Sequence, residues 1–362
     1  MSKSAVKVLP ETYPMNGGDG TYSYTKNSQF QKAASSIAKS MIDEAIADKL
    51  DINDFTSSSN DNIFRIADLG CSIGPNTFTD MQNILEAVQK KYQYQNEPEF
   101  QVFFNDHASN DFNTLFSSLP AEKNYFEAGV PGSFHGRLFP KSSLHFVHSS
   151  IALHWLSKVP EVLLDKNSQA WNRGKIHYTN ASDEVCKAYS SQFHKDIERF
   201  LDARAKEIVV GGMMVLIMPS LPEGIPCSCV PSGVMFDLLG SCLVDMAKDG
   251  LISEDEVDSF NLPVYAASAK EMTQLIQRNG CFSIERMELL RSHHLMVGIQ
   301  ITMQALTMHV RAGFEGIISK HFGSGIVDEL FVRFHKKIGE FPDILETSFK
   351  QGTQLVAVLK LK

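Results

Sequence analysis

Residues 62–106 restrict the fold of this chain more than any other segment. "NIFRIADLG" is a short apolar run that ends in glycine, and "EFQVFFND" is a second such run that ends in an acid. Between them, "PNTFTDMQNILEAVQKKY" opens with Pro, Asn and Thr and has the apolar spacing of a helix. A strand, a crossover helix and a second strand in this order are typical of parallel strands in one sheet. The segment therefore predicts an α/β fold.

The same alternation continues through the rest of the chain. We expect a long helix at "SDEVCKAYSSQFHKDIERFLDARAKEIV" and further strands at "SLHFVHSSIAL", "GMMVLIMP", "CFSIERMELL" and "TQLVAVLKLK". From residue 220 to 280 the pattern is mostly helical, which predicts an α-helical cap over the carboxyl edge of the sheet. We expect the core with an N-terminal lid segment in residues 1–219, the main part of the cap in 220–280, and the remaining core strands with a cap helix in 281–362.

The composition restricts the binding partners and the cell compartment that we expect. The chain has 362 residues and a formal net charge of −8, and its Lys and Arg residues are scattered, which argues against nucleic acid or a membrane surface as a partner. No signal peptide or membrane-spanning apolar run is visible, so we expect a cytoplasmic protein. The six cysteines form no CxxC pair, and His293 and His294 lack the spacing of helical metal ligands. We therefore expect reduced thiols and no zinc site.

The turn after the first strand, "ADLGCSIGPN", is the candidate cofactor site, because ligands of open α/β sheets bind outside the carboxyl ends of the strands. Gly70 and Gly74 are not spaced as GxGxxG and no GK[ST] is present, so neither a dinucleotide fingerprint nor a P-loop is predicted. Asp68 would repel phosphate and attract an amine or a sulfonium. Asp106 ends the second strand, where an acid accepts hydrogen bonds from ribose hydroxyls. Unless both acids only cap helices or turns, the site predicts S-adenosylmethionine (SAM).

Several motifs resemble, in order and spacing, the plant SABATH methyltransferases. They are "MNGGDGTYSYTKNSQFQ", "ADLGCSIGPN", "FFNDHASNDFN", "VPGSFHGRLFP", "SSIALHWLSKVP" and "VDSFNLPVYAAS". This family includes carboxyl methyltransferases of salicylate, jasmonate, benzoate, indole-acetate and loganate, and the xanthine N-methyltransferases of caffeine synthesis. The resemblance covers nearly the whole chain. It implies a Rossmann-like SAM-dependent methyltransferase core with a helical cap, S-adenosylhomocysteine as a product, and a homodimer.

Residue by residue, the resemblance implies a cofactor site. Its members would be Tyr24 and Ser28 closing over the cofactor, Cys71 and Asn76 lining it, Asp68 near its methionine end, Asp106 at the ribose hydroxyls, His107 where relatives often carry Leu, Ser133 and Phe134 flanking the adenine, and Ser150 next to the sulfonium.

The resemblance also implies an acceptor pocket and a metal site. Gln31 and Trp155 match the family's pair of side-chain donors to the substrate carboxylate. The positions that would contact the acceptor are Tyr24, Gln31, Ile151, His154, Trp155, Phe236, Tyr265 and Val310. In some relatives a magnesium ion is assigned to positions that correspond here to Asn172, Asp258, the carbonyl of Phe260, and Asn261. One carboxylate is a weak ligand set for such a hard cation.

The expected chemistry needs no general base, because a carboxylate with a pKa of about 4 is already ionised at neutral pH. The reaction needs geometry instead: oxygen, methyl carbon and sulfur must be nearly collinear. A buried carboxylate must also be hydrogen-bonded. The indole N–H of Trp155 and the amide of Gln31 are neutral donors that can hold the anion without a tight ion pair. His154 is either a packed core residue or a partner for a hydroxyl or carbonyl group of the substrate.

Two positions depart from the family pattern. Ile151 stands where many relatives carry Tyr, and Phe236 stands where salicylate-type enzymes tend to carry Trp. Both changes weaken a direct transfer of known specificities. We therefore expect methyl ester formation on a small plant carboxylic acid of unspecified skeleton. Two alternatives stay open: N-methylation of a xanthine or another heterocycle, and a catalytically silent protein that binds small molecules.

Overall fold

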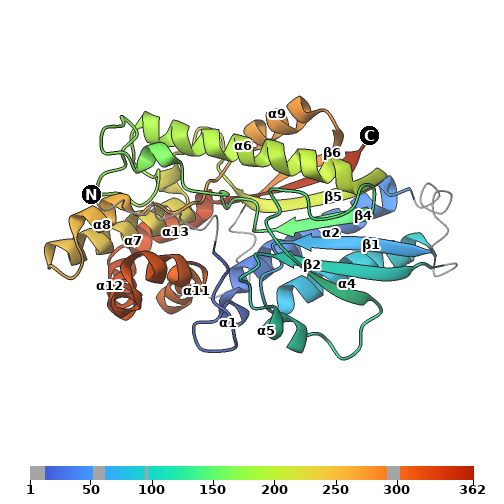
Figure 1. Ribbon diagram of the computed structural model, residues 1–362, viewed down its shortest axis with the longest axis horizontal. Coiled ribbons are helices and arrows are strands. Elements are labelled where there is room, and N and C mark those ends of the chain that lie inside the picture. The colour runs from blue at the N-terminus through green and yellow to red at the C-terminus, as the bar shows by residue number, and fades with distance from the viewer. Residues whose placement is uncertain (1–12, 52–61, 94–96, 292–301) are drawn as a thin grey trace, which may run out of the picture.

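The computed structural model describes residues 13–51, 62–93, 97–291 and 302–362. A seven-stranded sheet with helices on both faces makes up one part, and a group of helices beyond the strand ends makes up the other (Figure 1). The strands are β1 (Ile63–Leu69), β2 (Glu99–Asp106), β3 (Phe126–Pro131), β4 (Leu144–Ser150), β5 (Ile208–Ser220), β6 (Phe282–Arg291) and β7 (Thr353–Leu361). His293 and His294 lie outside the described residues.

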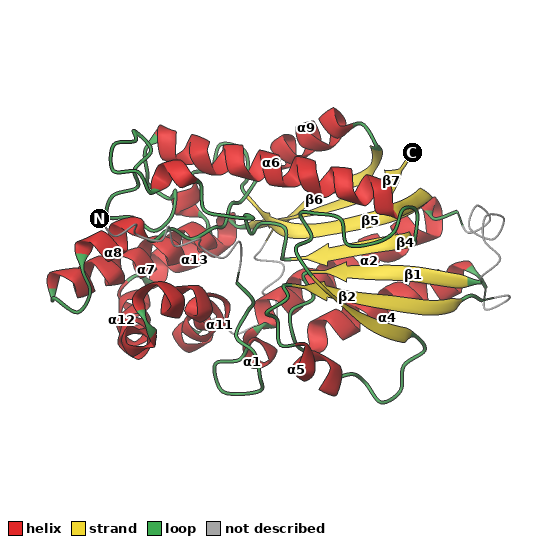
Figure 2. Cartoon of the chain, viewed as in Figure 1, coloured by secondary structure: helices red, strands yellow, loops and turns green. Residues whose placement is uncertain are grey.

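The helices fall into the same two parts (Figure 2). Those near the sheet are α1 (Tyr24–Asn27), α2 (Gln29–Lys49), α4 (Pro75–Lys91), α5 (Phe112–Ser117), α6 (Asp183–Glu207) and α9 (Ala269–Asn279). Those beyond the strand ends are α7 (Pro231–Lys248), α8 (Glu254–Ser259), α11 (Met303–Phe322), α12 (Val327–Glu340) and α13 (Pro342–Gln351). Single 3-10 turns occur at Glu161–Leu163, Cys227–Cys229 and Ser324–Ile326.

The sheet has the strand order β3-β2-β1-β4-β5-β7-β6. The first five strands in this order are parallel, whereas β7 lies antiparallel between β5 and β6. Asp68 in β1 is level with Phe104 in β2 and with His148 in β4. The carboxyl ends of these three strands therefore meet at one edge, which faces the helices beyond the sheet (Figure 1).

The core is divided by the sheet into two layers. Met214, Leu216 and Met218 of β5 pack with α6 and α9 on one face, and Val215 and Ile217 pack with α2 and α4 on the other. All of these β5 side chains are at most 1% exposed. This two-sided burial explains the unbroken apolar run of "GMMVLIMP", which is typical of central parallel strands.

A third apolar cluster joins α7, α8, α11, α12 and α13 into the cap. Helix α8 begins at Ser253 with a capping box, in which Ser253 and Glu256 bond each other's backbone N–H groups. Helix α9 also falls in residues 220–280, but it packs against α6 and β6 on the sheet. Residues 220–280 and 302–351 thus both contribute to the cap, and the three-part division of the chain stays a prediction.

The α/β class and the cap over the carboxyl edge are confirmed. Strand β3 has no counterpart among the expected strands, because "FEAGVP" at the sheet's edge is only partly buried and carries no apolar run. The expected strand at "SLHFVHSSIAL" stops at Ser150, since Ile151 takes a φ of 50°. All six cysteines are free thiols. Across the described ranges, no helix combines the length and apolarity that crossing a membrane requires.

Candidate active site

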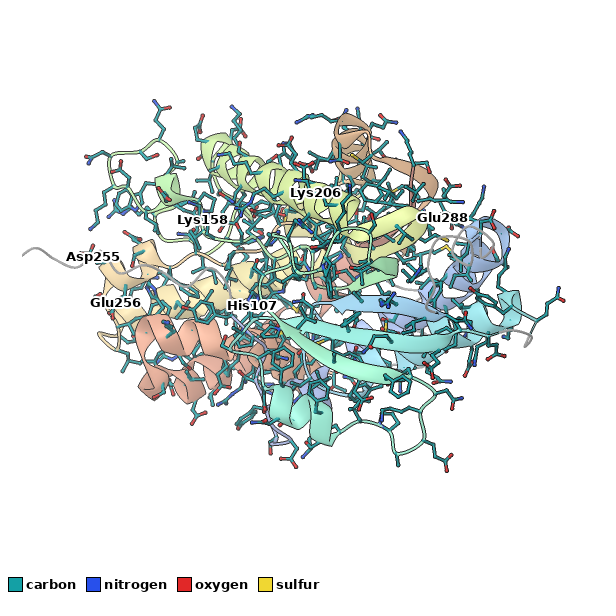
Figure 3. The ribbon with its side chains drawn as sticks, turned by 45° about the vertical axis from the view of Figure 1, so that its right-hand side comes forward. His107, Lys158, Lys206, Asp255, Glu256 and Glu288 are labelled. Atoms are coloured by element: carbon teal, nitrogen blue, oxygen red, sulfur yellow. The ribbon has the colours of Figure 1, made fainter. Side chains whose placement is uncertain are left out.

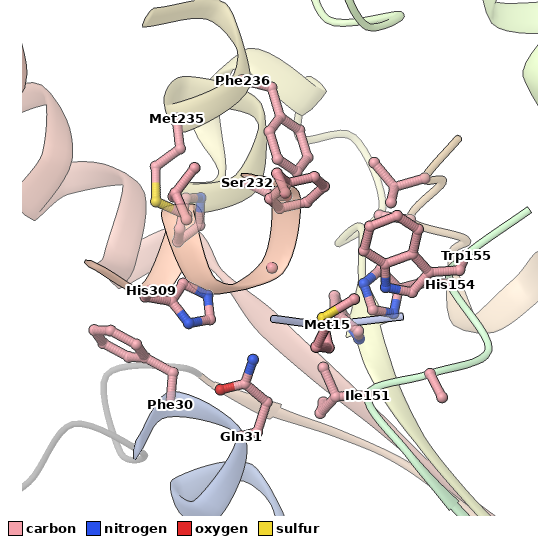
Figure 4. A pocket seen from close by; sticks show the side chains of 18 of the residues that line it. Met15, Phe30, Gln31, Ile151, His154, Trp155, Ser232, Met235, Phe236 and His309 are labelled. Carbon is pink, nitrogen blue, oxygen red and sulfur yellow. The ribbon is translucent and has the colours of Figure 1, made fainter. Parts of the chain in front are cut away.

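A cavity of about 220 Å³ lies between the carboxyl edge of the sheet and the cap. Its lining on the sheet side includes Gly70, Ser72, Asp106, His107, Phe134 and Ala152, and its lining on the cap side includes Phe236, Tyr265, His309, Val310 and Phe314. Gln31, His154 and Trp155 lie between the two sides (Figure 4). Among the described residues that line the cavity there is no Lys or Arg, and Asp106 is the one carboxylate. The cavity therefore suits a ligand that brings its own positive charge.

The turn after β1 brings backbone close to the cavity. Gly70 has a φ of 82°, and a Cβ added to it would lie 2.3 Å from the Cβ of Ala152. The N–H groups of Gly70 and Cys71 both donate to the carbonyl of Asn105 at the end of β2. Only glycine fits at position 70, because any other residue would have an unfavourable positive φ and a Cβ that clashes with Ala152.

Asp106 lies at the end of β2, where it faces the cavity. Its carboxylate accepts the N–H of Ser72 through Oδ2 and the N–H of His107 through Oδ1, both at 2.7 Å. Burial raises the pKa of Asp106, and the neighbouring His107 and the two N–H groups partly offset this. Burial also lowers the pKa of His107, which follows the strand next to the cap (Figure 3). A carboxylate has further lone pairs, so Asp106 can still accept from two ligand hydroxyls.

Asp68 is buried below the cavity lining. Its carboxylate accepts the hydroxyl of Thr77 at 2.5 Å and contacts Nδ1 of His148 at 2.8 Å. Burial lowers the pKa of His148, but the hydrogen bond to Asp68 and the charges of Asp68 and Asp80 outweigh it, and the net shift is upward. His148 and Asp68 are therefore an ion pair over the range in which His148 is protonated.

Residues 13–31 line part of the cavity and bond both the core and the cap. Asn16 donates its N–H to the carbonyl of Ala312 in α11, and Asn76 at the start of α4 donates to both the carbonyl and the hydroxyl of Ser28. Tyr24 lines the cavity, and burial together with nearby carboxylates raises its pKa. Its phenol thus stays neutral. Ser28 and Asn76 bond each other rather than lining the cavity.

Of the other cofactor positions, Phe134 lines the cavity, whereas Cys71 packs its thiol into the core and Ser150 contacts the hydroxyl of Ser35 at 3.1 Å. Ser133 precedes Phe134 in the loop after β3, which is held by buried side chains. Asn105 donates to the carbonyls of Val130 and Gly132, and Arg204 donates to those of Phe134 and Gly136. Arg204 itself is paired with Glu207 at 2.6 Å in the interior.

The expected acceptor positions all line this one cavity. The indole of Trp155 stacks on Phe314, and its N–H has no hydrogen-bond partner in the part of the chain that the structure describes. Figure 4 shows the amide of Gln31 directed into the cavity from α2. Both neutral donors of the expected clamp are therefore available to a ligand. Burial lowers the pKa of His154 to about 4, so this ring is neutral at physiological pH.

The remaining acceptor positions shape the walls. The phenol of Tyr265 donates to the carboxylate of Glu271 and so points its hydroxyl away from a ligand. Phe236 packs edge-on against Phe314 and against His177. Ile151 keeps a positive φ, which is a strained conformation for a β-branched residue and places its side chain in the lining. Sequence reasoning missed His177 and His309, which also line the cavity. Neither histidine stands in a motif that marks it as a site residue.

The four expected metal positions lie close together, but two of their oxygen atoms already accept hydrogen bonds from protein groups. Asp258 accepts the N–H of Gly174 through Oδ1 at 2.7 Å, and Asn261 Oδ1 accepts from the amide of Asn172 at 2.8 Å. Asn261 directs an unpartnered amide nitrogen into the interior. Within the described ranges no group of three His, Cys, Asp or Glu side chains could hold a metal. This arrangement does not fit a magnesium ion.

The chain is similar along almost its whole length to known methyltransferases. A family described as SAM dependent carboxyl methyltransferase matches residues 10–362. Loganic acid O-methyltransferase of Catharanthus roseus is 48% identical over 360 residues, 99% of this chain and 96% of that protein. Farnesoic acid carboxyl-O-methyltransferase of Arabidopsis thaliana is 41% identical over 356 residues, 97% of this chain and 99% of that protein.

A solved structure extends the likeness to the fold. The structure of loganic acid methyltransferase with S-adenosylhomocysteine (SAH) superposes with a TM-score of 0.93 at 48% identity, covering 96% of this chain and 99% of that one. The family match spans almost the whole sequence, and the likeness of fold extends over nearly all of both chains. The chain therefore belongs to the SABATH family of SAM-dependent carboxyl methyltransferases.

Proposed function

We propose that this enzyme forms the methyl ester of a small organic acid by in-line transfer, with Trp155 and Gln31 as the residues that hold the acceptor carboxylate. The observation that carries the proposal is the charge pattern of the cavity. Two neutral donors stand free on one side, Asp106 stands on the other, and the described lining has no cationic side chain. An arginine would hold a carboxylate more tightly, but it would also lower its nucleophilicity through a close ion pair.

Several cavity residues support the cofactor assignment. Asp106 offers lone pairs for the ribose hydroxyls, and Phe134 offers an aromatic face for the adenine. The turn at Gly70 leaves room for the cofactor to approach the protein backbone. Tyr24 and His107 also line the cavity and would add contacts to the cofactor. The other positions that the resemblance implies, Ser28, Asn76, Cys71, Ser133 and Ser150, are not among the described lining residues. Asp68 lies behind the turn at Gly70, so its charge would act on the cofactor across the turn and without direct contact. When bound, SAM supplies a methyl group that its sulfonium already activates.

The protein's part in the reaction is alignment. The acceptor carboxylate is ionised at neutral pH, so no residue has to remove a proton. Trp155 is fixed by its stack on Phe314, and its N–H can hold one carboxylate oxygen while Gln31 holds the other. A further lone pair on one of these oxygens stays free to attack the methyl carbon. Each such bond to a charged group is worth about 1.5–3 kcal/mol.

The specificity of the acceptor pocket would come from its walls. Ile151, His154, Phe236, Tyr265 and Val310 surround the space next to the clamp. With Ile in place of a phenol at 151, and with the Tyr265 hydroxyl bonded to Glu271, the wall near the clamp is apolar. This favours an acid whose carboxylate is attached to an apolar part of the carbon skeleton. The identity to the loganic acid and farnesoic acid enzymes supports testing terpenoid-derived acids first.

Oligomeric state and location complete the proposal. We propose that the enzyme acts in the cytoplasm and is a homodimer, as the family resemblance implies for its assembly. Light scattering of the purified protein and imaging of a tagged copy test these two points. No step of the mechanism passes through magnesium, because Asp258 and Asn261 already bond protein groups.

The enzyme assay uses methyl-labelled SAM with loganic acid, farnesoic acid, benzoic acid and xanthine, and identifies products by mass spectrometry. We expect a labelled methyl ester from at least one acid and no product from xanthine. Binding of SAM without ester from any acid would contradict the proposal. A labelled N-methyl product would overturn the carboxyl assignment.

A further inference from the structure

Two histidines face the acceptor half of the cavity, His154 after β4 and His309 in α11. Nδ1 of each ring is buried and has no hydrogen-bond partner among the residues that the structure describes. Figure 4 shows the His309 ring beside Gln31 and Met235, and the His154 ring beside Trp155. Because folded proteins bond nearly all of their buried polar atoms, these two nitrogens point to a ligand group that would complete them.

The contacts of His309 decide which role its Nδ1 can play. The backbone carbonyl of Asn27 accepts a hydrogen bond from the His309 ring, and the ring packs edge-on against Phe30 at 4.9 Å. A carbonyl can only accept, so the nitrogen facing Asn27 carries the hydrogen. Since Nδ1 is the unpartnered nitrogen, it carries a lone pair in the neutral ring. His309 therefore offers the cavity a hydrogen-bond acceptor.

The two rings are neutral and cannot serve as counter-ions. Burial lowers the pKa of His309 to about 4, and burial together with the nearby His309 lowers that of His154 to about 4. A lone pair repels a carboxylate, so His309 does not compete with Trp155 and Gln31 for the reacting group. Its partner must be a neutral donor, such as a hydroxyl group.

The surroundings of His309 sharpen this requirement. Phe30 and Met235 lie near the ring and provide no hydrogen-bond donor, and the amide of Gln31 beside it is assigned to the carboxylate. An acid with a purely hydrocarbon body would fill the space and leave Nδ1 desolvated without a partner. Leaving a buried polar atom unpaired in this way discriminates against such a ligand.

We propose that His309 is a specificity-determining residue that accepts a hydrogen bond from a hydroxyl group of the acceptor, with His154 as the second polar contact. The acceptor class is thus a hydroxylated acid. This inference rests on the proposed carboxyl methylation and adds a substrate class to it.

The test compares acids of one skeleton with and without a hydroxyl: benzoic with 3- and 4-hydroxybenzoic acid, cinnamic with 4-hydroxycinnamic acid, and cyclopentanecarboxylic acid with its 3-hydroxy derivative. In the natural enzyme we expect kcat/KM to be roughly tenfold or more higher for the hydroxylated member of at least one pair. His309→Phe keeps an aromatic ring but removes the acceptor, so it should lower kcat/KM for the hydroxylated acid more than for the plain acid and abolish that preference.

Two further variants keep the test decisive. His309→Gln retains a side-chain acceptor and should restore part of the preference, and His321→Gln removes a histidine of the same helix outside the cavity and should leave the preference intact. Equal kcat/KM within every pair, or an equal loss for both members in His309→Phe, would overturn the inference and leave the carboxyl methylation standing. Absence of ester from every acid would instead refute the carboxyl methylation.

Discussion

The indole of Trp155 stacks on the ring of Phe314, with centroids 5.1 Å apart and ring planes 28° apart. This stack joins a loop after β4 to the cap helix α11. It fixes the plane of the indole, and therefore the direction in which the free N–H points. Rigid placement of a single donor is what an in-line transfer between two bound molecules requires.

Trp155→Phe separates the donor from the packing. Phenylalanine can still stack on Phe314 but has no N–H, so we expect kcat/KM for the acid to fall by about ten- to a hundredfold. The dissociation constant of SAH, measured by titration calorimetry, should change little, because the cofactor contacts lie on the sheet side. Unchanged turnover would remove Trp155 from the clamp.

Gln31 is tested by comparing Gln31→Leu with Gln31→Glu. Leucine removes a donor, whereas glutamate places a second carboxylate next to the substrate's own, so the glutamate variant should be the less active at pH 7.5. Because a protonated glutamic acid can donate, its activity relative to the natural enzyme should rise as the pH falls toward about 5. Kinetic profiles from pH 5 to 8 give the comparison. Parallel profiles for both variants would contradict a direct contact with the anion.

Asp106→Asn examines the ribose site. The carboxylate accepts the N–H groups of Ser72 and His107, and an amide can accept only one of them while its NH₂ group opposes the other. We expect SAM to bind roughly ten- to a hundredfold more weakly. At saturating SAM, kcat should fall much less than kcat/KM for SAM. An unaltered affinity in calorimetry would exclude Asp106 from the cofactor site.

Gly70→Ala addresses the turn. The added methyl would lie 2.3 Å from the Cβ of Ala152 at a φ of 82°, so we expect a lower melting temperature and loss of measurable SAH binding. The double variant with Ala152→Gly removes the clash but keeps the unfavourable φ, and should recover part of both properties. Full recovery would show that only the clash matters, and no effect of the single variant would show that the turn can move.

Asp80→Asn tests the buried charges behind the cofactor site. Burial raises the pKa of Asp80 from 3.8 to about 6, while His148 lowers it and Asp68 raises it. The folded protein thus favours the protonated acid, a stabilisation that is present below about pH 4 and lost as the pH rises through about 6. The neutral Asn variant should therefore melt at a higher temperature than the natural protein at pH 7.5.

The pH dependence of that difference is the decisive measurement. The gain in melting temperature of Asp80→Asn should shrink as the pH is lowered from 7.5 toward 5, where Asp80 in the natural protein becomes protonated. Asp43→Asn is the control: its carboxylate pairs with Lys39 at the surface, and such pairs contribute little. A gain that does not depend on pH would assign the effect to packing rather than charge.

Much of the fold could be predicted because each central strand is a continuous apolar run. β5 is buried on both faces, and its sequence shows this without ambiguity. β3 was not predictable in the same way, since a half-exposed edge strand does not need apolar residues. The end of β4 also escaped, because no sequence pattern marks the positive φ of Ile151.

The site, too, contains residues that the sequence could predict and residues that it could not. Residues next to strand ends, such as Asp106 and Trp155, could be placed from motifs and resemblance, because their position in the sheet follows from their position in the sequence. Arg204 and Asn105 could not, since they act on the loop of Phe134 across long stretches of chain. His309 was hidden among apolar neighbours in α11, and only the three-dimensional arrangement shows its bare nitrogen.

The place of β7 has a consequence for how the protein matures. Its residues Thr353–Leu361 bond β5 on one side and β6 on the other, and Thr353 and Gln354 also line the cavity. β7 is translated after all other strands, so β6 has no partner and the pocket has a missing wall until synthesis has passed residue 361. A chain truncated before this strand therefore lacks both a partner for β6 and part of the pocket wall, and a stop codon before residue 353 should abolish the enzyme entirely.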